Sequence, residues 1–218
     1  MNAPPERVLV CFALAGEARP FRRRAGARRH VRVLVTGMGR DNARRALRDA
    51  LAAVRPAAVL TCGLAGGLHP ALARGAVLFS AAPDFAWSAR LLAAGARPAV
   101  FHSADRIAAT AAEKRRLREA TGADAVEMES AAIVAVCREA GVPCATVRVI
   151  SDAADEDLPL DFNRYLRPDF RLDWLRLLSA VARHPGRWRA LRALHRQTRA
   201  AAGRLADVLA AVTADPWR

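Results

Sequence analysis

The sequence has 218 residues, of which 53% are hydrophobic, and 35 basic residues against 21 acidic ones give a net charge of +14. This composition excludes a disordered chain, and the length suits one domain with a sizeable core. The longest early apolar run, residues 8–15, is far shorter than the roughly 20 residues that cross a bilayer.

Short apolar runs and helical patterns alternate along the chain. We expect strands at 8–13, 31–35, 58–62, 76–80, 125–128 and 143–150. We expect helices at 41–54, 110–121, 130–140 and 187–212. Asp41 or Asn42 would cap the first helix, and the charged run 113–116, which includes Lys114, would face solvent on the second. The alternation predicts an α/β fold with a parallel or mixed sheet, whose ligands gather at the carboxyl ends of strands.

Two regions depart from this alternation. Residues 81–102 contain Pro83, Trp87 and Gly95, which predict a loop or short strands. From about residue 172 the pattern becomes helical and rich in arginine, with an interruption at His-Pro-Gly 184–186. No repeat or linker divides the sequence. We therefore expect residues 1–218 to form one domain, with an Arg-rich helical extension from about residue 171.

Cysteine and histidine spacing argues against a metal site. The four cysteines, at positions 11, 62, 137 and 144, form no CxxC pair, and the five histidines are scattered. We expect buried free thiols in a reducing compartment, no metal and no organic cofactor. The N-terminal residues lack the basic start of a secretory signal, so we expect a cytoplasmic protein.

The positive charge is weak evidence for a nucleic-acid partner. Lys114 is the only lysine, and the Arg-rich, Ala-rich composition is typical of a GC-rich genome. A basic nucleic-acid-binding module remains an alternative. Such a module would want aromatic side chains among its basic ones, and the sequence has seven Phe, one Tyr and four Trp, mostly in apolar contexts.

Carboxylates stand at or just past the carboxyl ends of three predicted strands. They are Glu17, the two acids of the stretch VEMES at 126–130, and Asp152, which follows Arg148 and Ser151 on the last strand. Acids in such places can do acid–base work. Each one alone is explained as simply by a helix start or a turn.

Two glycine-rich segments also follow strands. The segment 36–39, TGMG, gives GxG, but Asn42 occupies the place of the third glycine and the next strand ends without an acid, so the dinucleotide-binding fingerprint fails. The segment 63–67, GLAGG, could make room for a sugar or a phosphate, yet it lacks the Lys-Ser/Thr ending of a P-loop. Each could equally be a tight turn.

The order of these motifs is more informative than any one of them. In chain order they are Glu17, 37–39 (GMG), 61–68 (TCGLAGGL), 126–129 (VEME) and 148–152 (RVISD). Together they resemble the purine nucleoside phosphorylase and 5'-methylthioadenosine/S-adenosylhomocysteine nucleosidase superfamily, over about residues 8–166. The resemblance implies a three-layer α/β/α fold with a mixed central sheet flanked by helices. It also implies cleavage of the N-glycosidic bond of a purine nucleoside, such as methylthioadenosine, S-adenosylhomocysteine or adenosylhopane, with release of adenine.

The resemblance implies roles for the two most specific motifs. Glu129 would bind the ribose 2'- and 3'-hydroxyls, Met128 would lie under the ribose, and Glu127 would sit beside it. Asp152, supported by Ser151, would protonate N7 of the purine. Carboxylates would then stabilise positive charge on the sugar while an acid neutralises the leaving base.

The resemblance implies further contacts around the sugar. Glu17 and Arg148 would position a nucleophilic water, and Phe162 and Leu14 would face the 5' substituent. The glycine segment completes the predicted substrate contacts with Gly63 and Gly66.

Water and phosphate are the two candidate nucleophiles. Phosphorylases of the superfamily hold phosphate with an arginine and a serine, and the corresponding places here look like Thr61 and Leu64. Because a phosphate with few donors binds poorly, hydrolysis is favoured. Arg40 or Arg74 could supply a contact, so phosphorolysis, with phosphate as co-substrate, stays an alternative.

Several features resemble the hopanoid-associated branch of the superfamily. The segment between residues 80 and 103 is shorter than in typical methylthioadenosine nucleosidases, and the extension after about residue 171 is added. The stretches 121–123 (TGA) and 158–159 (LP) also resemble that branch. The basic C-terminal helix could rest on an anionic membrane, although packing on the core is the simpler interpretation. The superfamily also implies a homo-oligomer.

Overall fold

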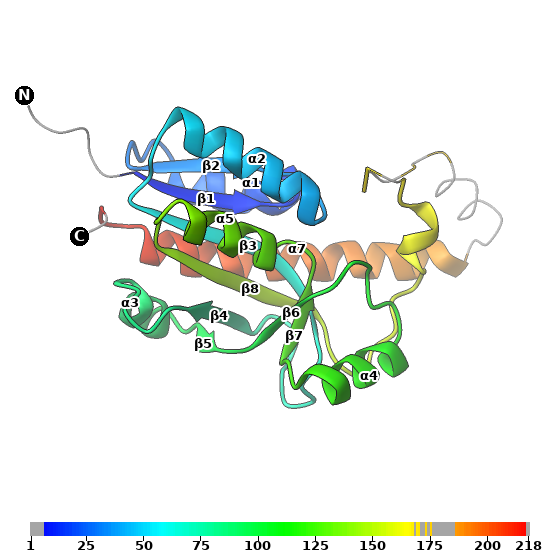
Figure 1. Ribbon diagram of the computed structural model, residues 1–218. Helices are drawn as coiled ribbons and strands as arrows, with labels where there is room; N and C mark the ends of the chain where they lie inside the picture. The colour runs from blue at the N-terminus through cyan, green and yellow to red at the C-terminus, as the bar shows by residue number, and fades with distance from the viewer. Residues whose placement is uncertain (1–6, 168, 171–172, 174, 176–185, 217–218) are drawn as a thin grey trace, which may run out of the picture.

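A mixed β-sheet forms the centre of the protein (Figure 1). The computed structural model describes residues 7–167, 169–170, 173, 175 and 186–216. Its strands are β1 (Val8–Phe12), β2 (Val31–Val35), β3 (Ala58–Gly67), β4 (Val77–Ala81), β5 (Arg97–Pro98), β6 (Phe101–Ser103), β7 (Ala125–Glu127) and β8 (Cys144–Asp152).

The longest strands lie at the middle of the sheet. The strand order is β2-β1-β3-β8-β4-β5, and β7 pairs with both β3 and β6 outside this path. Strands β2, β1, β3 and β8 run parallel, whereas β4 is antiparallel to β8 and β7 is antiparallel to β3. The parallel strands β1, β3 and β8 therefore end at one edge of the sheet, where α/β proteins bind ligands.

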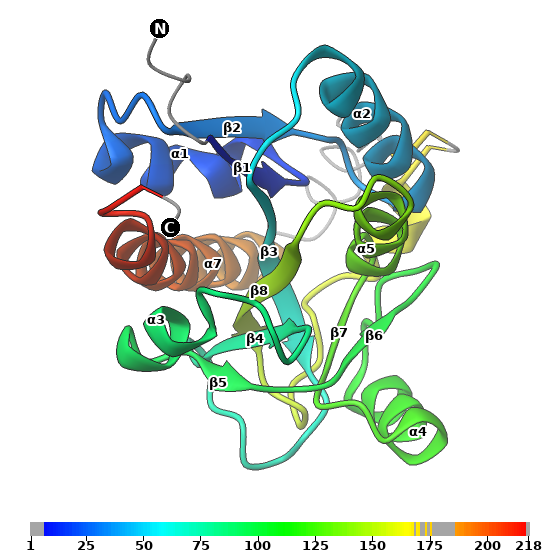
Figure 2. The same cartoon turned by 60° about the vertical axis from the view of Figure 1, so that its left-hand side comes forward.

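Helices cover both faces of the sheet. They are α1 (Ala15–Ala25), α2 (Arg40–Ala53), α3 (Ser88–Ala93), α4 (Ala111–Thr121), α5 (Ser130–Glu139), the 3₁₀ helix η1 (Phe162–Tyr165) and α7 (Gly186–Val212). Figure 2 shows α1, α3 and α7 on one face, α2 and α5 on the other, and α4 beyond β6 and β7. This arrangement confirms the predicted three-layer α/β/α fold.

Each face of the sheet has its own apolar cluster. On the side of α1, α3 and α7, one cluster includes Phe12 of β1, Phe21, Trp87 and Leu209, all at most 1% exposed, and the ring centroids of Phe12 and Phe21 lie 6.0 Å apart. On the side of α2 and α5, buried Leu47 and Ile133 pack with residues of the sheet. The four cysteines are free, and those at positions 11, 62 and 137 are buried, which confirms the prediction of buried thiols.

The glycine segment 63–67 differs from the predicted turn. These residues continue β3, which pairs with β8 through this segment and has a register shift between Ala65 and Gly66. The residues of β8 that lie opposite include Arg148, which is paired with Gly63. A small residue with no side chain is therefore needed within the sheet, and a tight turn does not explain the glycines.

Two predictions about helix surfaces were wrong. The N-cap of α2 is Gly39, with no side-chain cap, because the side-chain amide of Asn42 instead donates to the carbonyl of Met38. Helix α4 does begin with a capping box, in which the Thr110 hydroxyl accepts from the backbone N–H of Glu113. However, Lys114 is 0% exposed and does not face solvent.

The region predicted as a loop or short strands contains short strands and also a helix that was not predicted. Helix α3 and strands β5 and β6 lie within it, and Trp87 is fully buried at the start of α3. Most of the segment around 171–185, including the predicted interruption at 184–185, lies outside the described residues.

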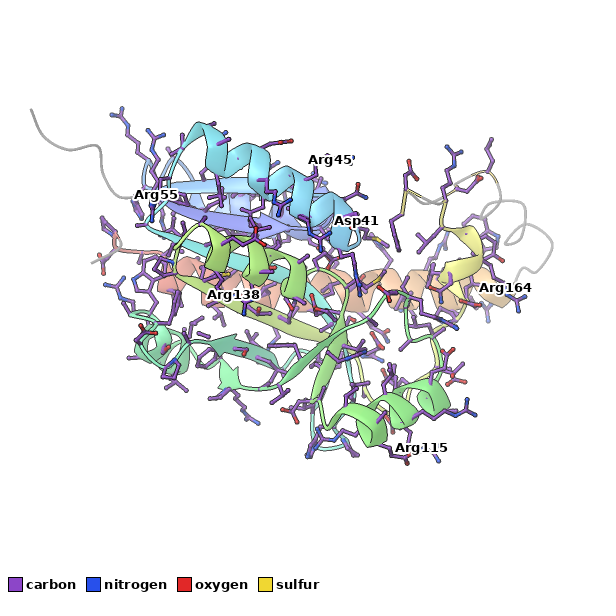
Figure 3. All side chains as sticks on the ribbon, in the orientation of Figure 1. Asp41, Arg45, Arg55, Arg115, Arg138 and Arg164 are labelled. Carbon is purple, nitrogen blue, oxygen red and sulfur yellow. The ribbon has the colours of Figure 1, made fainter. Side chains whose placement is uncertain are left out.

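The long helix α7 packs with its C-terminal half against α1 and the sheet. Among the helices of the described residues, none has the length and apolar character to traverse a bilayer. Arginines such as Arg45, Arg55, Arg115, Arg138 and Arg164 project from separate elements into solvent (Figure 3). The positive charge is thus spread over the surface of several helices and loops.

The packing of α7 yields a stability prediction. Leu209→Ala should lower the free energy of unfolding by about 2–5 kcal/mol, because Leu209 is 0% exposed and its removal leaves a cavity. Urea unfolding monitored by circular dichroism measures the change. The matched control Leu92→Ala alters a leucine that is 52% exposed and should cost less than about 1 kcal/mol. Equal losses of unfolding free energy in the two variants would mean that Leu209 of α7 is not packed in the core in solution.

Candidate active site

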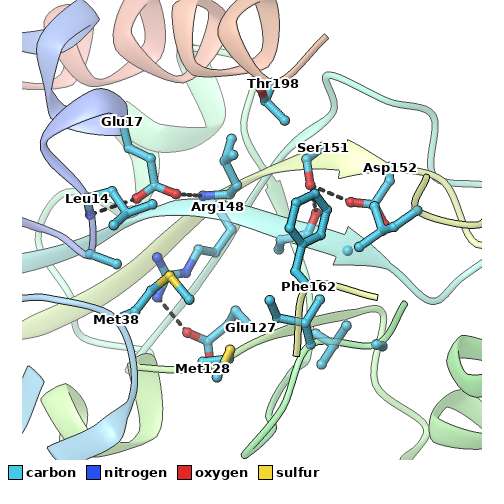
Figure 4. A pocket seen from close by; sticks show the side chains of 18 of the residues that line it. Leu14, Glu17, Met38, Glu127, Met128, Arg148, Ser151, Asp152, Phe162 and Thr198 are labelled. Atoms are coloured by element: carbon cyan, nitrogen blue, oxygen red, sulfur yellow. Dashed lines mark hydrogen bonds and ion pairs between the residues drawn. The ribbon is translucent and has the colours of Figure 1, made fainter. Parts of the chain in front are cut away.

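A cavity of about 320 Å³ lies where β1, β3, β7 and β8 end (Figure 4). Nearly all the side chains predicted to contact substrate line it: Leu14, Glu17, Gly66, Glu127, Met128, Glu129, Arg148, Ser151, Asp152 and Phe162. Gly63 does not line the cavity and lies behind it, beside Arg148 and Glu17. The motifs that are far apart in the sequence are therefore brought to one place.

Arg148 is the central cation of the cavity and is only 1% exposed. Its Nη2 lies 2.5 Å from Glu127 Oε2, 3.5 Å from Glu129 Oε2 and 3.4 Å from Thr61 Oγ1. Burial alone would lower the pKa of Arg148, but the nearby carboxylates of Glu127, Glu129 and Glu17 outweigh it and raise that pKa. The guanidinium therefore stays charged.

Glu127 is held almost entirely by protein donors. Its Oε2 accepts from the backbone N–H groups of Glu129 and Ser130 at 3.0 and 2.8 Å, and its Oε1 accepts from the hydroxyls of Ser130 and Ser103. Burial acts to raise the pKa of Glu127, but Arg148 and these hydrogen bonds outweigh it and lower the pKa. An ionised carboxylate with its oxygens occupied is better suited to fixing Arg148 than to contacting the sugar directly.

Glu129 is also buried but keeps more free acceptor capacity. Its Oε1 accepts a 2.9 Å hydrogen bond from the backbone N–H of Gly39, and its Oε2 faces the more distant Arg148. Burial raises the pKa of Glu129, with Arg148 acting in opposition. Gly39 has φ of 85°, a conformation that glycine adopts readily. The GMG segment thus presents a backbone donor to Glu129, which accounts for a glycine motif without a dinucleotide.

Glu17 lies in the first turn of α1, partly exposed at the floor of the cavity. The backbone N–H groups of Leu14 and Leu64 reach its two oxygens only at 3.4 and 3.5 Å. Burial is the main cause that raises its pKa from 4.5 to about 7, while Arg148 opposes the rise. Glu17 can therefore change its protonation state near neutral pH, as a catalytic base must.

Gly63 keeps Glu17 and Arg148 close without a side chain between them. A Cβ at position 63 would lie 2.5 Å from Arg148 Nη1 and 3.2 Å from Glu17 Oε2. None of the ion pairs found among the described residues joins Glu17 and Arg148 directly. Glu17 and Arg148 therefore lie near each other beside Gly63 without a direct ion pair.

Asp152 stands at the end of β8, 8% exposed, with a partner on each carboxylate oxygen. The Ser151 hydroxyl lies 2.6 Å from Oδ1 and 3.2 Å from the carbonyl of Ala65, so its single proton can serve either. The ammonium group of Lys114 lies 2.5 Å from Oδ2. This ion pair was missed because the sequence pattern assigned Lys114 to the solvent side of its helix.

Other lining residues were also missed. Met38 comes from the GMG segment, Ile107 from the loop before α4, and Leu194 and Thr198 from α7. The side-chain amide of Asn163 in η1 accepts from the backbone N–H of Ile107 and donates to its carbonyl, both at 2.9 Å. These bonds fix the segment that carries the neighbouring Phe162. Met38 was the one with a sequence signal, since it lies between the two glycines of a strand-end motif.

The described residues offer no set of side chains arranged to bind a metal ion. Across residues 7–167 and 186–216 and the few described positions between them, no group of three His, Cys, Asp or Glu side chains is arranged to hold a metal ion. The charged groups that line the cavity are the carboxylates of Glu17, Glu127, Glu129 and Asp152 and the guanidinium groups of Arg106 and Arg148. They can move protons and stabilise positive charge.

Comparison with known proteins agrees with this geometry. The model of the phosphorylase superfamily matches residues 78–183. Aminodeoxyfutalosine nucleosidase of Campylobacter jejuni subsp. jejuni is 36% identical over 70 residues, which is 32% of this chain and 31% of that protein. The 5'-methylthioadenosine/S-adenosylhomocysteine nucleosidase of Shewanella halifaxensis is 50% identical over 42 residues, 19% of this chain and 18% of that protein. The matches thus span less than a third of the length of these curated relatives.

The likeness of fold extends over nearly the whole chain. The crystal structure of 5'-methylthioadenosine/S-adenosylhomocysteine nucleosidase from Helicobacter pylori with butyl-thio-DADMe-Immucillin-A superposes with a TM-score of 0.73 and 18% identity, covering 96% of this chain and 98% of that one. The resemblance to the hopanoid-associated branch stays a prediction. At the broader level, residues 78–183 belong to the phosphorylase superfamily, and the short matches to curated nucleosidases and the fold are consistent with that assignment.

Proposed function

We propose that the protein hydrolyses the N-glycosidic bond of a 5'-substituted adenosine and releases adenine. The observation that carries the proposal is the joining of Glu17, Arg148, Glu129 and Asp152 in one cavity. The names of the relatives, which include methylthioadenosine, S-adenosylhomocysteine and aminodeoxyfutalosine nucleosidases, support an adenosine with a 5' substituent. Adenosylhopane is a further candidate of this class, suggested by the sequence resemblance alone.

The reaction assigns a separate task to each polar group. Glu129 accepts hydrogen bonds from the ribose 2'- and 3'-hydroxyls and faces the positive charge that develops on the ring as the bond to the base breaks. Ionised Glu17 takes a proton from the water that attacks C1', and Arg148 orients that water. Asp152 gives a proton to N7 of the purine, so the electron pair of the C1'–N9 bond leaves with a neutral base. The products are the free sugar and adenine. Glu17 then releases its proton to solvent, and Asp152 takes one up, which restores the starting state.

Water is favoured over phosphate by the charges around the cavity. Arg40 forms an ion pair with Asp105, and Arg74 forms one with Glu156. Neither arginine lines the cavity. Arg106 does line it but is paired with Glu113, and Arg148 is already paired with Glu127. A phosphate beside Glu17 and Glu129 would meet negative charge with few free donors. Phosphorolysis by the same site remains the alternative.

The wider setting of the enzyme also belongs to the proposal. We expect residues 1–218 to act as one domain, in a homo-oligomer in the cytoplasm. Peripheral contact of the basic C-terminal helix with an anionic membrane stays a prediction, and no nucleic-acid partner is expected.

The primary test is adenine release from a panel of 5'-substituted adenosines. We expect phosphate-independent release by the wild-type protein, and in Asp152→Asn a loss on the order of 10²–10⁴ in kcat with little change in ligand affinity, since the amide cannot protonate N7. Release measured by liquid chromatography, with binding of adenosine measured by calorimetry, separates the two effects. Strict phosphate dependence would establish the alternative reaction, and wild-type turnover in the Asn variant would remove the assigned acid.

The pKa of Glu17 predicts a pH dependence of both activity and stability. Adenine release should fall as pH decreases below about 7, because protonated Glu17 cannot accept a proton. The folded protein binds this proton more tightly than the unfolded chain, so the stabilisation is complete below pH 4.5 and is lost as pH rises through about 7. At pH 8 the charged group costs the fold at most about 3 kcal/mol.

Glu17→Gln separates these two effects. The variant should lose adenine release at every pH, and its melting temperature should rise relative to wild type at pH 8 but not at pH 4.5. Differential scanning fluorimetry across this range measures the difference. A melting-temperature difference that is the same at all pH values would contradict the raised pKa.

Gly63 offers a test of the space beside Arg148. Gly63→Ala should lower adenine release by about 10² or more, since a displacement of about 1 Å in a catalytic group has effects of that order. The new Cβ would lie 2.5 Å from Arg148 Nη1, so the guanidinium must move. Gly16→Ala is the matched control, because a Cβ there meets nothing within 4 Å. Steady-state rates of the two variants should differ; similar rates would show that Arg148 can move without consequence.

A further inference from the structure

Lys114 is a fully buried cation whose contacts converge on the end of β8. Its Nζ lies 2.5 Å from Asp152 Oδ2 and donates to the carbonyls of Ala153 and Glu156, both at 2.7 Å. An ammonium group has three protons, and here each has one acceptor. The Lys114 side chain is 0% exposed and that of Asp152 is 11% exposed, so the lysine end of the ion pair is shielded from water.

Asp152 is the carboxylate that pairs with Lys114, because the nearby carboxylate of Glu156 binds other groups. The carboxylate of Glu156 binds Arg74 and the backbone N–H of Ala153, so Glu156 offers only its carbonyl to Lys114. Among the ion pairs of the described residues, Asp152 is the only acid that Lys114 meets.

The shape of the site suits lysine. The three acceptors lie 2.5–2.7 Å from a single nitrogen, whereas the donors of a guanidinium are spread over a planar fork. In a sequence with 35 basic residues, the one lysine thus occupies a place where the acceptors converge on a single nitrogen. Gly66 contributes space, because a Cβ there would lie 3.3 Å from Asp152 Oδ2 and 3.8 Å from Lys114 Cε.

We propose that Lys114 is a positioning residue for protonation of the leaving base: it fixes Asp152 and stabilises the carboxylate that remains once Asp152 has given up its proton. The inference rests on the proposed function. In the step, the proton moves from the Asp152 carboxyl to N7 of the purine, the electron pair of the C1'–N9 bond moves to the base, and Lys114 keeps its own three protons. The ion pair is then the state of the site after proton transfer. Stabilising that state promotes transfer to the base.

The dependence of kcat on the leaving group distinguishes this role of Lys114 from a purely structural one. Electron-withdrawing substituents at C2 of adenine let the base depart with less help from an acid. We therefore compare 5'-methylthioadenosine with its 2-fluoro and 2-chloro derivatives as substrates for Lys114→Met. We expect kcat for 5'-methylthioadenosine to fall about 10-fold or more, as part of the 10²–10⁴ that proton donation contributes, and the loss to shrink for the halogenated substrates. KM should change far less than kcat.

Two further variants make the comparison robust. Lys114→Gln keeps donors for the two carbonyls but removes the charge, and it should show the same dependence on the leaving group; it also replaces the Met variant if that one does not fold. Arg74→Met disturbs the turn that holds Ala153 and Glu156 without touching Asp152, so it should change the rates of all three substrates by one common factor.

Each result has a definite meaning. A loss in both Lys114 variants that is equal for all three substrates, or wild-type rates throughout, would overturn the role of Lys114 and leave the proposed function intact. Absence of base release from all three substrates by the wild-type protein would count against the nucleosidase proposal itself, and this inference would fail with it.

Discussion

The cavity depends on one buried guanidinium that compensates several carboxylates. Without Arg148, the charges of Glu17, Glu127 and Glu129 would repel one another in a space that water screens poorly. The effect of Arg148 on the pKa of each carboxyl group depends on the distance between them. Direct contact lowers the pKa of Glu127, whereas Glu17, which has no direct ion pair with Arg148, keeps a pKa raised to about 7. One cation therefore supports a permanent anion and a titratable acid in the same site.

The sheet makes this arrangement possible. Parallel pairing of β3 with β8 sets Gly63 opposite Arg148, and the missing side chain leaves room for the guanidinium beside the sheet backbone. The turn after β2 brings the N–H of Gly39 to Glu129. In both places glycine allows backbone and a charged side chain to approach closely, which explains why the glycine segments and the carboxylates belong to one site.

Much of the fold and of the site could be predicted from the sequence. The strands follow from local apolar runs, and the site residues follow strands whose ends lie at one edge of the sheet. Apolar runs predicted the strands, and acids at strand ends such as Glu129 and Asp152 come together because those ends do. Helix periodicity could not predict the burial of Lys114, since that depends on how α4 packs against the turn after β8. Glycine composition could not distinguish a turn from a strand at Gly63. The sequence around Thr198 also gives no sign that this residue lines a cavity formed mainly by residues far from it in the chain.

Helix α7 joins the core to the cavity wall. Leu205 and Leu209 pack beneath the sheet, while Leu194 and Thr198 line the cavity farther along the same helix. From Leu194 to Leu209 the helix rises about 22 Å at 1.5 Å per residue, so these two leucines lie far apart along the helix. Sequence change on the cavity half can thus reshape the cavity while the anchoring half keeps the fold. This separation gives the protein a route by which the shape of its cavity can change without loss of stability.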